Sequence, residues 1–231
     1  MQRIIFSILI SITLSCNSQE KRSTENIQQT KTVEKKLTGN EVVLELEKRE
    51  FFNLTDPLEL ETAKKELAES KDNLNYFSGA MRGETVEFTD NRFFWIDCEE
   101  LFEIGGLKIY LEKVKPTFKK LGLEFEYEDE KSEQNGDSWN HTIEINGKKY
   151  TAFDGEFSEA DWEIAYINFI EMLNDQLDLQ NSNNRFYPIN CGNGGQMVLL
   201  TSEQFEFVQA NYPNDSEHPE ELNKWKQKIG L

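Results

Sequence analysis

The sequence is poor in histidine, cysteine and proline: its 231 residues include two His, three Cys and five Pro. Neither His141 nor His218 belongs to an HExxH pattern or to another spacing of metal ligands, which argues against a histidine-based zinc site. No serine lies in a GxSxG motif, and no GK[ST] follows a glycine-rich turn. We therefore expect neither a bound metal ion nor a cofactor, and none of these catalytic motifs indicates an enzyme.

Basic side chains are also scarce, because 25 Lys and Arg stand against 43 Asp and Glu, for a net charge of −18 at pH 7. Nucleic-acid binding depends on contacts of Lys and Arg with phosphates. The sequence therefore predicts no nucleic-acid partner. An acidic excess suits solubility by itself, a cation or a basic protein partner.

The apolar run from Ile4 to Leu14 covers 11 residues and is broken by serine and threonine. A membrane-spanning helix needs about 20 residues, so this run is too short for one. It follows Arg3 and precedes the small residue Ser15, which is the order of a secretory signal. We predict that residues 1–15 are a signal peptide.

Leu14-Ser15-Cys16 resembles the lipobox of bacterial lipoproteins. In that family the signal peptidase cuts before the cysteine, which carries lipid on its thiol and on its new amino group. Leucine usually stands three residues before the cysteine, where this sequence has Thr13. The resemblance covers the first 16 residues only. It implies that Cys16 is lipidated and anchors the protein in the cell envelope, on the periplasmic or the cell-surface side of a bacterial membrane. An ordinary secretory signal with an unmodified cysteine is the alternative.

The segment after the cysteine has little to bury. Residues 16–38 contain no aromatic side chain, which predicts a flexible tether, and residues 17–38 carry a net charge of +2. The remaining residues, 39–231, carry 40 Asp and Glu against 19 Lys and Arg, for a net charge of −21. We expect the basic tether to suit an anionic lipid surface and the acidic domain to be held away from it.

Residues 39–231 are predicted to form one acidic α+β domain, in which residues 39–80 can be a helical annex. Apolar residues recur with helical spacing from Leu107 to Leu121 and, most clearly, after Ser158. Asn146-Gly147 between two strand-like runs predicts a type I′ hairpin that pairs Ile145 with Lys148. We expect a mostly antiparallel sheet of about 5–7 short strands with helices packed on it.

Shorter patterns predict further local features. Asn40 is expected to cap a helix, and Pro116 to kink or split another. The alternation from Leu123 to Glu128 predicts a strand. We also expect strands from Glu84 to Thr89 and from Arg92 to Asp97, joined at Asp90-Asn91. His141 shares a strand face with apolar residues, which indicates a core histidine.

With Cys16 lipidated, Cys98 and Cys191 are the two remaining thiols. An exported location permits a disulfide between them. In the entropic model a loop of that length would stabilise the fold by about 4–5 kcal/mol. Two buried free thiols are the alternative, and the sequence leaves both open.

Two further groups of residues are candidates for a site. The first is Gly192, Asn193, Gly194 and Gly195, which form either a hairpin turn or a loop that binds a substrate or partner. The second is Trp95 with Asp97, Glu99 and Glu100, because an aromatic platform with acids suits a sugar site. A helix cap with solvated acids is the alternative for the second group.

Two classes of function fit these features. The first is a tethered protein-binding module, of which toxin-neutralising immunity proteins are one version, by analogy of size, charge and address. The second is a cell-envelope hydrolase that uses paired carboxylates, or a carbohydrate-binding lipoprotein. Because neither a nucleophile nor a metal motif is found, the binding module is the prediction that the sequence favours.

Overall fold

The computed structural model describes residues 36–73, 77, 80–82, 85–87, 91–212 and 218–230. The predicted signal peptide (1–15), Cys16 and most of the predicted tether (16–38) lie outside the described residues. Residues Lys36–Leu231 form one compact unit. Within the described part of this unit, no helix combines the length and the apolar character that crossing a membrane requires.

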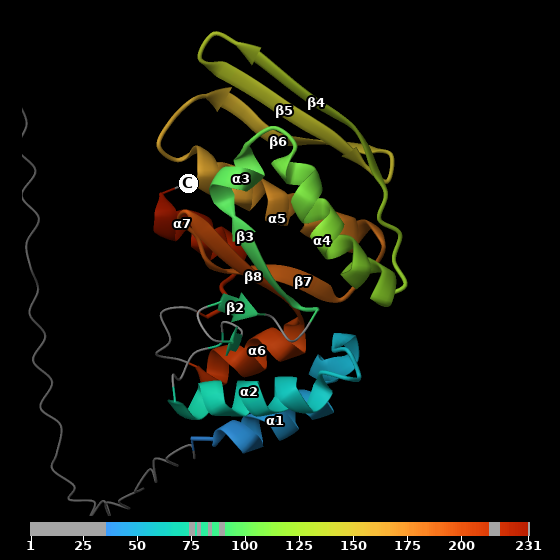
Figure 1. Cartoon of the computed structure of the whole chain (residues 1–231), viewed down its shortest axis with the longest axis vertical. Coiled ribbons are helices and arrows are strands. Elements are labelled where there is room, and N and C mark those ends of the chain that lie inside the picture. Colours follow the sequence, from blue (N-terminus) through green and yellow to red (C-terminus); the bar gives the residue numbers. More distant parts are fainter. Residues whose placement is uncertain are drawn as a thin grey trace, which may run out of the picture. The chain divides into compact units, whose positions relative to one another are not determined.

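The elements lie in four layers, alternately helical and β (Figure 1). The first layer contains α1 (Gly39–Lys48), the 3-10 helix η1 (Phe51–Leu54), α2 (Leu60–Asn73) and α6 (Ser202–Asn211). The second is the central sheet, with strand order β3 (Phe93–Asp97), β8 (Gly194–Thr201) and β7 (Asn184–Asn190). The third contains α3 (Cys98–Phe102), α4 (Gly106–Lys120) and α5 (Asp161–Leu179). The fourth is the outer sheet, in the order β4 (Tyr127–Asn135), β5 (Ser138–Ile145) and β6 (Lys148–Glu156). The remaining elements are β1 (Ala80–Arg82), β2 (Thr85–Glu87) and α7 (Leu222–Ile229).

The central sheet separates two hydrophobic cores. Met197 and Leu199 point into the core shared with α4 and α5, whereas Val198 and Leu200 point into the core shared with α1 and α6. All four side chains are fully buried. A strand buried on both faces has a near-continuous apolar sequence, and β8 has that sequence.

The outer sheet buries one face only. On β5, Trp139, Ile143 and Ile145 are buried toward the helices, while Glu144 lies on the other face between Glu128 and Lys149. The predicted hairpin is confirmed: Asn146 and Gly147 both have positive φ, 49° and 76°, as a type I′ turn requires, and Ile145 pairs with Lys148.

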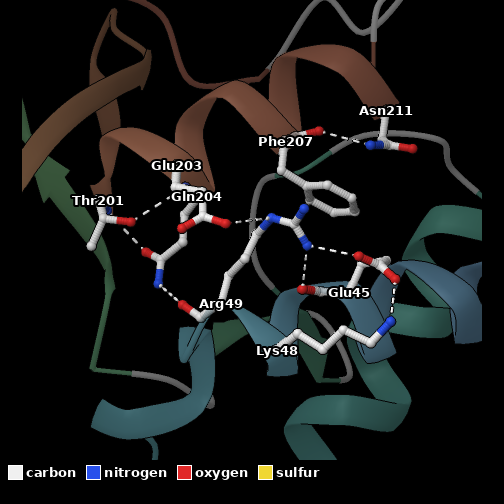
Figure 2. Close-up of polar contacts among 8 residues, drawn as sticks. All are labelled: Glu45, Lys48, Arg49, Thr201, Glu203, Gln204, Phe207 and Asn211. Atoms are coloured by element: carbon white, nitrogen blue, oxygen red, sulfur yellow. Dashed lines mark hydrogen bonds and ion pairs between the residues drawn. The ribbon is translucent and has the colours of Figure 1, made fainter.

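The first helix is fastened to α6 by a cluster of polar contacts around Arg49 (Figure 2). The Arg49 guanidinium lies 4.5 Å from the Phe207 ring centre and donates to the Glu45 carboxylate at 2.8 Å. Its Nε atom is 3.5 Å from the Glu203 carboxylate. The Gln204 side chain donates to the Arg49 carbonyl at 2.8 Å. The predicted annex is thus tied by side chains to the same helix that covers the central sheet.

Helix boundaries correct several local predictions. The cap of α1 is Thr38, not Asn40, and its capping box with Glu41 is complete. Helix α4 runs unbroken across Pro116, which loses one backbone hydrogen bond without ending the helix. Thr201 and Gln204 form a complete capping box at the start of α6.

The strand predicted from Leu123 to Glu128 was wrong over most of its length. The alternating residues 123–126 are not in a strand, and β4 instead begins at Tyr127 and continues through a highly polar segment to Asn135. The two strands predicted on either side of Asp90-Asn91 are present as β2 and β3, which pair with β1 and β8 respectively. Residues 88–90 lie outside the described residues.

The fold is α+β with antiparallel sheets, as predicted. The strands are divided between separate sheets, so each three-stranded sheet is smaller than the single sheet that the sequence indicated. Both sheets direct apolar side chains at the same layer of helices, as Ile143 and Leu199 show by sharing one core. Helices α4 and α5 contribute to that core and lie between the sheets.

Candidate functional site

Four aromatic side chains, here called the aromatic cluster, meet at one end of the outer sheet: Phe102, Trp139, Phe153 and Phe157. The Phe102 ring centre lies 4.5 Å from that of Trp139, 5.0 Å from that of Phe153 and 6.3 Å from that of Phe157, always edge-to-face. Such geometry is favourable for aromatic pairs. Trp139 and Phe153 are buried, but Phe157 is 47% exposed. The cluster therefore presents an aromatic surface held on a rigid base.

Acidic residues adjoin this surface in the chain. Glu103 follows Phe102 at the end of α3, and Glu156 precedes Phe157 at the end of β6; both are exposed. The backbone N–H of Phe157 donates to the carbonyl of Asp137, itself exposed, at 3.0 Å. An exposed aromatic centre with a polar, charged rim is the usual anatomy of a protein-binding surface.

The buried side chain of His141 packs against the aromatic cluster through Trp139. The Trp139 ring stacks on His141 at 5.3 Å, and His141 Nε2 lies 3.0 Å from Glu130 Oε1. The second Glu130 oxygen lies 3.0 Å from Lys108 Nζ. A bulge in β4, where Asp129 has φ 53°, turns Glu130 inward. His141 is thus a satisfied, buried core histidine, as the sequence indicated.

The acids near Trp95 are engaged in local structure. Asp97 Oδ1 accepts a hydrogen bond from the Glu100 backbone N–H at 3.1 Å and caps α3. Glu100 accepts from the Tyr110 hydroxyl at 2.5 Å. Burial, with this bond to Glu100, raises the pKa of Tyr110 above its usual range. Glu99 is exposed in the first turn. These contacts favour the helix-cap interpretation for Asp97 and Glu100.

Trp95 itself is 45% exposed and borders a shallow hollow of about 150 Å³, counting the part open to solvent. Tyr110, Lys113 and Phe169 are among the other residues that line it. Small-molecule sites usually have volumes of about 300–1,000 Å³. The hollow is therefore too small to favour a sugar site.

The glycine-rich segment Gly192–Gly195 covers the turn between β7 and β8 and the first two residues of β8, and close packing favours glycine at two of its positions. A Cβ on Gly195 would lie 2.8 Å from the Tyr166 ring and 2.9 Å from Cys98 Sγ. A Cβ on Gly194 would lie 3.1 Å from Trp95 Nε1. The carbonyl of Asn193 accepts from the Cys98 N–H at 2.9 Å. These contacts favour the hairpin-turn interpretation.

The same turn brings the two cysteines together. Cys98 Sγ and Cys191 Sγ lie 3.8 Å apart, and both thiols are free. Cys98 is the first residue of α3, and Cys191 directly follows β7. The sequence left open whether these residues form a disulfide or remain free thiols, and it gave no position for them in the fold.

Sequence reasoning missed the aromatic cluster and Glu130. Phe102 is the last residue of a five-residue helix, and Phe157 lies outside any periodic pattern. The sequence around each residue therefore gives no indication that the two side chains meet. Within the described ranges, no group of three or more His, Cys, Asp and Glu is placed to hold a metal ion.

Comparison with known proteins adds no family to this description. No protein-family model, no curated protein and no solved structure matches the chain. The function is therefore inferred from the residues and their geometry.

Proposed function

We propose that this protein is a membrane-anchored lipoprotein of the bacterial cell envelope whose acidic domain binds a basic protein. The observation that carries the binding function is the aromatic cluster: Phe157, 47% exposed, packs on Phe102 at one end of the outer sheet. Exposed aromatic side chains that rest on a buried aromatic base are typical anchors of protein interfaces.

Charge supports a basic partner. Residues 39–231 carry a net charge of −21, and Glu103 and Glu156 adjoin the cluster. Complementary charge accelerates association and suppresses wrong partners, and its effect weakens as salt is added. The outer face of the sheet continues this character through Glu128, Glu144 and Glu133.

The N-terminal sequence supports a role in the cell envelope. Leu14-Ser15-Cys16 resembles a lipobox, and lipid on Cys16 would anchor the chain durably. An immunity-type module, which neutralises a toxin at the membrane, is one version of this proposal. A toxin gene beside the gene of this protein would support that version.

The test is a photo-crosslinking residue in place of Phe157, in full-length chain incubated with a cell-envelope extract of the source bacterium. We expect it to capture a basic protein, identified by mass spectrometry, and we expect capture to fall steeply between low and physiological salt. The control places the same residue at Leu179, which is 56% exposed at the end of α5.

Two substitutions complete the test with the captured protein in purified form. Phe157→Ala should weaken binding at least tenfold, because an anchoring aromatic contributes about 2 kcal/mol or more. Leu179→Ala should change binding little. Equal capture at both positions, or equal affinity of both variants, would contradict the proposal.

A further inference from the structure

The two thiols occupy different environments. Cys98 is fully buried, and its sulfur and the Tyr166 ring both lie close to Gly195. Cys191 is partly exposed and begins the turn that leads to Gly192. Cys191 is therefore the residue of the pair that is in contact with solvent, and its sulfur lies 3.8 Å from that of Cys98.

Electrostatics strengthens this difference. A hydrogen bond between the thiols and burial both raise the pKa of Cys98 far above its usual value. The hydrogen bond from Cys98 lowers the pKa of Cys191. The thiolate, which is the reactive form of cysteine, is therefore favoured at Cys191.

A carboxylate lies near both sulfurs. Glu163, in the first turn of α5, is close enough that its negative charge raises the pKa of each thiol. Its Oε2 atom is buried and has no hydrogen-bond partner among the described residues. The site thus combines two neighbouring thiols with a nearby carboxylate whose charge opposes their ionisation.

We propose that Cys98 and Cys191 form a redox site that closes to a disulfide by exchange with a disulfide-bearing oxidant, with Cys191 as the attacking thiol and Cys98 as the resolving thiol. The oxidant is either a small disulfide or the oxidised dithiol of another protein. This inference does not depend on the proposed binding function.

The exchange takes place in two steps. The Cys191 thiolate attacks one sulfur of the oxidant and forms a mixed disulfide with it; the S–S bond of the oxidant breaks, and its other sulfur leaves as a thiolate that takes a proton. The Cys98 thiol then loses its proton and attacks Cys191 Sγ, which releases the second oxidant sulfur as a thiol. Overall, two protein thiols are oxidised and one oxidant disulfide is reduced to two thiols.

Closure requires movement, because the sulfur atoms must approach from 3.8 Å to about 2.05 Å. Cys98 is held by its N–H bond to the Asn193 carbonyl and by its packing against Gly195. Asn193 and Gly195 lie in or beside the turn after Cys191, so closure has to move the Cys191 side chain or this turn relative to Cys98. Trp95 lies against Gly194 in that turn, so its fluorescence should change when the bond forms.

The test uses the full-length chain with Cys16→Ala, in which Cys98 and Cys191 are the remaining thiols. We expect oxidised glutathione to remove both thiols together and to leave an internal disulfide, detected by mass spectrometry after unfolding. With Cys98→Ala added, the product should be a stable glutathione adduct on Cys191. With Cys191→Ala added, Cys98 should stay reduced. Dimers linked between chains, or adducts on Cys98 in the unsubstituted pair, would overturn the proposal.

One measurement needs no cysteine substitution at the pair. A substoichiometric amount of iodoacetamide should label Cys191 at least tenfold more than Cys98, as peptide mapping can show. Equal labelling would contradict the assigned order of attack. This result stands even where a cysteine variant fails to fold.

A second variant tests the role of the carboxylate. Glu163→Gln should speed alkylation of Cys191 at pH 7 by roughly threefold, because a nearby negative charge that opposes the thiolate is removed. Glu171→Gln, farther along the same helix, is the control and should leave the rate unchanged. A slower reaction in Glu163→Gln would show that the carboxylate does not oppose the thiolate, and would overturn this part of the site.

Discussion

The two three-stranded sheets are both antiparallel, but they differ in how many of their faces are buried. The central sheet is buried on both faces, and consecutive residues of β8 enter two different cores. The outer sheet buries one face and exposes the other, with carboxylates along the exposed side. The side chains of the central sheet therefore contribute to both cores, whereas the exposed face of the outer sheet is available for contact with another molecule.

The largest expected effect comes from shortening adjacent side chains in each sheet. Leu199→Ala and Leu200→Ala should each lower the free energy of unfolding by about 3 kcal/mol, because each leaves a cavity in one core. On β5, Ile143→Ala should cost about as much, but Glu144→Ala should change stability by less than about 0.5 kcal/mol. Urea unfolding followed by circular dichroism measures all four. A costly Glu144→Ala would show that the outer face is covered.

Glycine substitutions sharpen the comparison with a smaller effect. Gly195→Ala in β8 should cost about 1–3 kcal/mol, because its Cβ would meet Tyr166 at 2.8 Å. Gly155→Ala in β6 should be neutral, since its Cβ would lie at an ordinary 3.7 Å from the Phe153 ring. Thermal unfolding of both variants provides the measurement. Equal losses at the two positions would refute the difference in packing between the sheets.

The smallest expected effect concerns an ion pair at the hairpin of the outer sheet. Burial alone would raise the pKa of Asp175, but hydrogen bonds from Lys148 and Tyr150 outweigh it and hold the pKa below its ordinary value. Because its pKa is lower in the folded chain, ionised Asp175 stabilises the fold at pH values above about 3.9, its pKa in the unfolded chain. This stabilisation is lost as the pH falls through the folded-state pKa.

Asp175→Asn should therefore cost less than about 1 kcal/mol at pH 7, given the partial exposure of the pair, and progressively less below about pH 4. Urea unfolding at pH 7 and at pH 3 provides the measurement. A loss that grows toward low pH would contradict this sign. Lys148→Met at the same two pH values is the matched control, because it removes the same ion pair from the other side.

Local signals explain which parts of the fold could be predicted. Asn146-Gly147 needs no tertiary context, because the turn type follows from two residues that accept positive φ. The Thr201 cap is equally local. Strand β4 could not be predicted, because its edge position leaves most of its side chains in solvent and removes the apolar alternation. Only the pairing of its backbone with β5 makes it a strand.

The candidate sites depend on contacts that are distant in sequence. Phe102 and Phe157 are 55 positions apart, and α3 and β6 bring them together. Cys98 and Cys191 could be named from the sequence because they were the last two thiols, but their distance and unequal burial could not. The predicted acid cluster near Trp95 was chosen for its composition, and the structure gives Asp97 and Glu100 partners within the same small helix and its neighbour.

The layered order also separates the beginning of the domain from the aromatic cluster. Helix α1, which the chain enters at its capped N-terminus, belongs to the core on one side of the central sheet, whereas the outer sheet belongs to the core on the other. The point of attachment and the aromatic cluster are thus separated by the whole thickness of the domain. Substitutions on α1 can therefore be made without touching the aromatic cluster.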